Sequence, residues 1–130
     1  MAERITLEVP ATLNALSTVR MVLGGLGARL DFSLDDLDDL FLATDRLLGA
    51  ALDAEKLTSL RVQCLLDGAT LRVEAGLFHS PALRDQVVVT PGGCIDLCTL
   101  LQRLVDDVVV EEDGDCFSVV IVKHRTESAA

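Results

Sequence analysis

The sequence predicts an α/β two-layer sandwich, in which a mixed, mostly antiparallel sheet carries its helices on one face. Three observations predict this fold. Several short segments alternate apolar and polar residues, three longer segments repeat apolar residues at helical spacing, and the order is strand, two helices, two strands, helix, two strands. With 130 residues and 50% hydrophobic content, the chain can bury one core, so we expect a single domain over residues 1–130.

The first strand is expected over residues 5–9, where apolar and polar residues alternate up to Pro10. The first helix is expected from Leu13, with Thr12 as its N-cap, because the following apolar residues keep helical spacing. Three glycines either weaken the end of this helix or let another backbone approach it closely: Gly24, Gly25 and Gly27.

The second helix is expected to begin after Ser33, which forms a capping box with Asp36. The aspartates of the first turn are interpreted as surface charges that favour the helix dipole, and the alternative is an acidic docking patch. One apolar face is expected to be buried, formed by Leu34, Leu37, Phe41, Leu48 and Leu52.

The second half of the chain predicts two hairpins and one helix. Residues 59–66 and 70–77 form antiparallel strands joined through Asp67-Gly68, and residues 78–93 form a long irregular connection. A helix over residues 95–105 precedes a closing hairpin of residues 108–110 and 117–122, and the chain beyond about residue 125 is expected to fray.

Charge excludes one class of function. The chain carries a formal net charge of −10, which repels phosphate backbones, so direct nucleic-acid binding is not expected. An acidic surface favours encounter with a basic protein partner. No signal peptide or membrane-spanning segment is expected, so the protein is predicted to be cytoplasmic with reduced cysteines.

Three segments carry a resemblance to a known family. They are residues 32–40 (FSLDDLDDL), residues 42–45 (LATD) and residues 101–108 (LQRLVDDV). In this order they resemble the small ATP-binding anti-sigma factor and serine-kinase family, which has the fold of histidine-kinase and gyrase ATPase domains. The resemblance covers residues 5–123, nearly the whole chain.

The resemblance implies a nucleotide site with a partly altered metal position. Active members carry Glu-x-x-x-Asn on the second helix, where the carboxylate acts as a base and the amide oxygen holds Mg²⁺. Asp45 matches the carboxylate, so it is the catalytic residue if the protein is a kinase. Gly49 stands at the asparagine position and supplies no oxygen for a hard cation, so we expect no protein metal site.

The resemblance also implies residues that would contact ATP if it binds. The family's Asp-x-Gly-x-Gly motif, which receives adenine, is matched best by residues 74–78, so Glu74 and Gly76 are the candidate adenine contacts. Phe78 replaces the second glycine. Gly92 and Gly93 precede the last helix, where backbone amides favour phosphate.

Other chemical groups are assigned simpler roles. Cys94 and Cys98 share a helix face and are interpreted as core residues rather than metal ligands. The adjacent His79 and Ser80 are placed in a surface loop because no orienting acid completes a catalytic arrangement.

The resemblance implies an anti-sigma regulatory protein that forms a homodimer, binds a sigma factor and is countered by an anti-sigma antagonist, with no cofactor required. One alternative is a serine kinase that uses ATP and Mg²⁺ to phosphorylate the antagonist. Another is a scaffold that shares only the fold and binds some other regulator.

Overall fold

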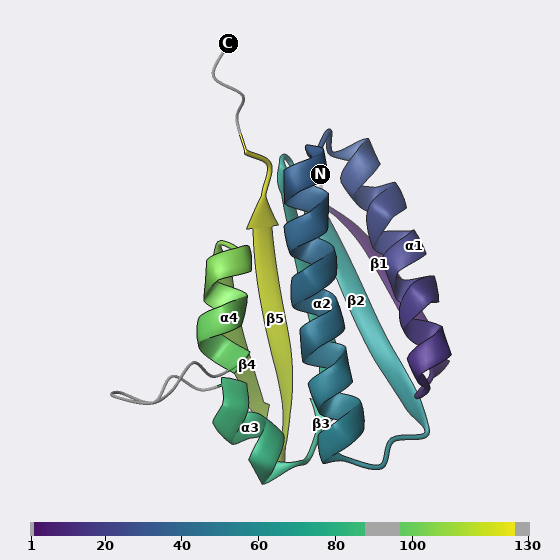
Figure 1. Cartoon of the computed structure of the whole chain (residues 1–130), viewed down its shortest axis with the longest axis vertical. Coiled ribbons are helices and arrows are strands. Elements are labelled where there is room, and N and C mark those ends of the chain that lie inside the picture. The colour runs from purple at the N-terminus through teal and green to yellow at the C-terminus, as the bar shows by residue number, and fades with distance from the viewer. Residues whose placement is uncertain (1, 88–96, 127–130) are drawn as a thin grey trace.

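The computed structural model describes residues 2–87 and 97–126, which form one sheet with helices on one face (Figure 1). The sheet has the order β1-β2-β3-β5-β4, and every neighbouring pair of these strands is antiparallel. Its strands are β1 (Glu3–Pro10), β2 (Ser59–Asp67), β3 (Thr70–Phe78), β4 (Asp107–Asp113) and β5 (Cys116–His124). The helices are α1 (Leu13–Arg29), α2 (Leu34–Ala54), α3 (Pro81–Val87) and α4 (Leu97–Leu104). The predicted two-layer α/β sandwich is confirmed.

Helix α1 begins as the sequence predicts, because the Thr12 side-chain oxygen accepts a hydrogen bond from the Ala15 amide at 3.3 Å. Of its three glycines, Gly27 serves the closest approach, since a Cβ there would collide with the Leu37 side chain of α2. Gly25 has no atom within 4 Å of a Cβ position. The close contact therefore lies at the end of α1, where the chain turns into α2.

The capping box at the start of α2 is confirmed, with the Asp36 amide donating to Ser33 Oγ at 3.0 Å. The predicted buried face of this helix is partly wrong, because the Leu34 side chain is 79% exposed. The buried apolar positions are Leu40, Ala43, Leu47, Leu48 and Ala51. The reason is that α2 faces the sheet with these residues, while Leu37 and Phe41 lie beside α1.

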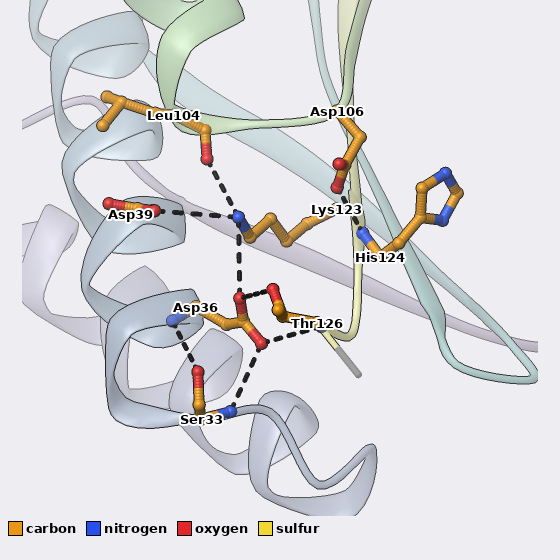
Figure 2. Close-up of polar contacts among 8 residues, drawn as sticks. All are labelled: Ser33, Asp36, Asp39, Leu104, Asp106, Lys123, His124 and Thr126. Atoms are coloured by element: carbon orange, nitrogen blue, oxygen red, sulfur yellow. Dashed lines mark hydrogen bonds and ion pairs between the residues drawn. The ribbon is translucent and has the colours of Figure 1, made fainter. Parts of the chain in front are cut away.

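Asp36 is the main correction to the first turn of α2, because it is only 3% exposed and is not a surface charge (Figure 2). Its carboxylate lies 3.7 Å from Lys123 Nζ, and Lys123 also lies 3.8 Å from Asp39 and donates to the Leu104 carbonyl at 3.1 Å. Thr126 donates to Asp36 through its amide at 3.0 Å and its hydroxyl at 2.6 Å. We call Asp36, Asp39, Lys123 and Thr126 the Asp36 cluster.

The Asp36 cluster holds the chain after β5 one residue beyond the point where fraying is expected. Thr126, which the sequence places in the frayed tail, is bonded to α2, and residues 127–130 lie outside the described part of the chain. Lys123 reaches Asp36 from β5, so the cluster connects α2, β5 and the segment after β5 (Figure 2).

The hairpins are close to the prediction. Asp67 pairs with Thr70, so the β2–β3 loop is Gly68-Ala69, one residue later than expected, and Gly68 has a φ of 62° that glycine tolerates. The short helix α3 lies within the segment expected to be irregular, and residues 88–93 of that segment are outside the described residues.

The core is mainly aliphatic, as the low aromatic content predicts. Leucine, valine and alanine side chains from the helices pack against Leu60, Val62, Val73 and Ile121 of the sheet. Phe78 and Phe117 add an aromatic contact with ring centroids 5.8 Å apart. Among the helices of the described residues, none combines the length and apolar character needed to cross a membrane.

Replacing Asp36 with alanine is expected to lower the free energy of unfolding by about 3 kcal/mol, because Lys123 keeps a buried charge and Thr126 loses its acceptor. The neighbouring exposed Asp35 is the matched control, and D35A is expected to cost less than about 1 kcal/mol. Urea denaturation of both variants measures the difference. Equal losses would contradict the role assigned to Asp36.

The stability that Asp36 contributes is expected to depend on pH. Burial raises the pKa of Asp36, but hydrogen bonds from Thr126 and Ser33 outweigh it and hold the pKa below its ordinary value. A lowered folded pKa contributes stability that is present above the unfolded value of about 3.9 and is lost as pH falls through the folded value. The difference between wild type and D36A should therefore shrink below about pH 4.

Candidate functional site

A groove between α2, α3 and α4 holds the residue that the sequence marks as catalytic. It encloses a volume of 600 Å³. Helix α2 contributes Asp45, Arg46, Gly49, Ala50, Asp53 and Ala54. The opposite wall comes from Ala82 and Gln86 of α3 and Leu97 and Leu100 of α4. The two α2 residues that the sequence assigns to the candidate site, Asp45 and Gly49, therefore both line a groove.

Asp45 lies at this groove but its carboxylate already has a partner. Arg20 of α1 forms an ion pair and hydrogen bond with it, and the Arg20 guanidinium lies 5.4 Å from the centroid of the Phe41 ring. The two charged side chains are 52% and 31% exposed, so solvent screens the pair and its net stabilisation is modest. Asp45 would have to leave Arg20 before it served as a general base.

The sequence does not indicate Arg20 as the partner of Asp45. The residue lies 25 positions before Asp45, and no local pattern joins two helices across that distance. The ion pair depends on α1 and α2 lying side by side, with Gly24 beside Phe41 one turn further along α1. The small glycine lets the two helices approach, and the approach places Arg20 over Phe41.

Gly49 is open to the groove, because no described atom outside its own helix backbone lies within 4 Å of the position that a Cβ would take. The position has room for a side chain but supplies no oxygen for Mg²⁺, which needs well-placed oxygen ligands. Among the described lining residues Arg46 is the one cationic side chain, and Asp45 and Asp53 are acidic. The described part of the lining therefore offers one cation to a triphosphate and no side-chain oxygen at position 49 for Mg²⁺.

Glu74 does not join Asp45. It lies on the sheet face away from the helices, in a second hollow of 390 Å³ lined in part by Arg61, Gln63, Glu111 and Ser118. Burial and the neighbouring carboxylate of Glu111 raise the pKa of Glu74. Because side chains alternate along a strand, the next residue, Ala75, faces the helices and is 2% exposed. The described strand therefore presents no carboxylate toward the groove at this point.

Of the three glycines predicted to contact ATP, Gly76 lies in the described structure. A Cβ at Gly76 would lie 2.9 Å from the Ser118 Cβ, so this glycine permits the close approach of β3 and β5. Gly92 and Gly93 lie outside the described residues, and their proposed phosphate contacts stay a prediction.

The cysteines and histidines include one pair that the sequence did not indicate. Cys98 is buried, which agrees with the core role assigned to it, and Cys94 lies outside the described residues. No group of three metal-ligating side chains occurs in residues 2–87 and 97–126. His79, assigned to a surface loop, contacts Cys116 of β5, with Cys116 Sγ 3.2 Å from His79 Nδ1.

Comparisons with known proteins identify a similar structure but no similar sequence. No family model matches the chain, and no curated protein matches it. The solved structure of the RsbU and RsbW domains of Rv1364c from Mycobacterium tuberculosis is similar over 94% of this chain, with a TM-score of 0.68 and 17% identity. The chain spans 32% of that solved chain.

This likeness shows the fold. The described strands and helices have the α/β sandwich architecture of a structure that contains an RsbW domain, which agrees with the fold expected from the sequence resemblance. At 17% identity the likeness does not transfer site residues, so the roles of Asp45 and Gly49 rest on their own geometry.

Gly49→Asn is expected to fold normally and to leave the free energy of unfolding unchanged or raised by a few tenths of a kcal/mol. The reasons are that a side chain has open space there and that asparagine is a slightly better helix former than glycine. Thermal unfolding followed by circular dichroism measures the effect. Gly76→Ala is the contrasting variant, because its Cβ would meet Ser118, and it should be destabilised. A G49N variant as unstable as G76A would contradict the open groove.

Proposed function

We propose that this protein is an anti-sigma regulatory protein that binds a sigma factor, is released by an anti-sigma antagonist, and makes no efficient use of ATP. One combination carries the proposal. The chain has the fold of a structure containing an RsbW domain, the anti-sigma factor and serine-kinase class, while its groove has Gly49 at the metal-ligand position.

The groove supports a binding role over phosphoryl transfer. Phosphoryl transfer depends on metal and cationic groups that neutralise the developing charge on the phosphates. Here the described lining is acidic at Asp45 and Asp53, Asp45 is paired with Arg20, and Ala75 is the residue of β3 that faces the helices beside Glu74. The two carboxylates oppose the phosphates, and Arg46 is the one cation of the described lining that could neutralise their charge.

The partner surface is proposed on the outer face of α1 and α2. The exposed large apolar side chains on these two helices are Leu13 and Met21 of α1 and Leu34 and Leu42 of α2. Exposed aspartates accompany them at Asp35 and Asp38. Exposed apolar side chains together with aspartates on α2 suit a partner with a basic, partly apolar surface, and the net charge of −10 would speed its approach.

Two alternative functions are a serine kinase and a scaffold for another regulator. The position of Asp45 at a groove favours the serine-kinase alternative, in which an antagonist would be phosphorylated with ATP and Mg²⁺. A scaffold that shares only the fold would bind a regulator other than a sigma factor. Homodimer formation belongs to the proposal and follows from the family resemblance.

Each purified sigma factor encoded in the same genome should be tested for binding to the immobilised protein by biolayer interferometry. We expect saturable binding of one sigma factor. Met21→Glu is expected to weaken it about tenfold or more, because the change places a charge in the apolar part of the proposed surface. Leu77→Glu is the matched control, since Leu77 is also exposed but lines the hollow on the other sheet face.

Two results would separate the alternatives. Binding of no sigma factor by a folded protein would contradict the anti-sigma proposal, and equal loss in the M21E and L77E variants would contradict the proposed surface. Release of the bound sigma factor on addition of the antagonist, without ATP, is the further result that the proposal predicts.

A further inference from the structure

A thiol and an imidazole meet at one end of the sheet. Phe78 of β3 pairs with Phe117 of β5, so the residues just outside this pair, His79 and Cys116, are brought side by side. Cys116 Sγ lies 3.2 Å from His79 Nδ1 and 3.8 Å from Nε2. The shorter of these distances places Nδ1 within hydrogen-bonding reach of the thiol.

The main chain around this pair is held in place while its side chains reach solvent. The His79 amide donates to both carboxylate oxygens of Glu55 at 3.0 Å, and the preceding Phe78 is buried against Phe117. His79 is exposed and Cys116 is partly exposed. A small reagent can therefore reach a sulfur that already has a basic group beside it.

The other described cysteines differ in access. Cys64 is 1% exposed and Cys98 is 3% exposed. Burial also raises the pKa of the Cys64 thiol to about 11, which suppresses the reactive thiolate. Of the three cysteines in the described residues, Cys116 alone combines solvent access with a contact to an imidazole.

We propose that Cys116 is a modification site that reacts with hydroperoxides, with His79 as the base that accepts the thiol proton. The sulfur attacks one peroxide oxygen, the O–O bond breaks, and the leaving oxygen takes the proton from His79. Cys116 becomes a sulfenic acid and the hydroperoxide becomes an alcohol, or water when the oxidant is hydrogen peroxide. The sulfur loses two electrons and the peroxide gains two.

Hydrogen bonds connect the segment that contains His79 to helix α3, which lines the groove. Ser80 follows His79, and its hydroxyl accepts a hydrogen bond from the Leu83 amide in α3 at 3.2 Å. Glu55 also accepts from the Ser80 amide at 3.3 Å, so the α2 end, His79 and the start of α3 are joined. Helix α3 contributes Ala82 and Gln86 to the groove and begins two residues after His79, the residue that contacts the sulfur.

The test measures peroxide oxidation residue by residue. The protein carries Cys94→Ser, which leaves the three described cysteines, and is treated with hydrogen peroxide and dimedone before peptide mass spectrometry. We expect dimedone on Cys116 and far slower labelling of Cys64 and Cys98. His79→Asn in the same background should slow labelling of Cys116 about tenfold, because asparagine cannot accept the thiol proton.

Two controls make the result specific to the pair. H79N retains the backbone amide that Glu55 accepts from, and circular dichroism should show an unchanged fold. Added imidazole should restore part of the lost rate in H79N. The proposal is overturned if Cys116 reacts no faster than glutathione, or if H79N reacts at the wild-type rate.

Discussion

The buried carboxylate of Asp36 is the directional contact on which the arrangement of the two layers depends. Most of the remaining interface between helices and sheet is apolar, and such packing favours burial without specifying direction. Asp36 accepts from the cap of α2 and from Thr126 after β5, and it lies 3.7 Å from Lys123 of β5. The start of α2 is therefore fixed over the end of β5, and α2 then carries Asp45 and Gly49 to the groove.

Much of the fold was predictable because its signals are local. Thr12 and Ser33 cap their helices as expected, and β2 and β3 alternate buried and more exposed residues. The errors arose where distant parts of the chain meet. Asp36 was interpreted as a surface charge because its partners lie 87 to 90 residues later, and Leu34 was expected to be buried because spacing gives the period of a helix but not the direction of its apolar face.

The candidate site was predictable only in part, for the same reason. The family pattern lies within one helix, so the sequence could assign Asp45 and Gly49 to one site, and both line the same groove. The separation of Glu74 from Asp45 depends on strand alternation, which turns Glu74 to one sheet face and Ala75 to the other. The Arg20–Asp45 ion pair joins residues 25 positions apart, and the His79–Cys116 contact joins residues 37 positions apart. No local sequence pattern indicates either contact.

The central proposal is that the protein binds a protein partner through α1 and α2 and that the groove beside α2 does not bind Mg-ATP. Titration of the protein with Mg-ATP by calorimetry tests it most directly, at concentrations that detect dissociation constants up to about a millimolar, or roughly −4 kcal/mol. The account predicts no saturable heat. Saturable binding at one site, abolished by Asp45→Asn, would contradict it and would support a kinase.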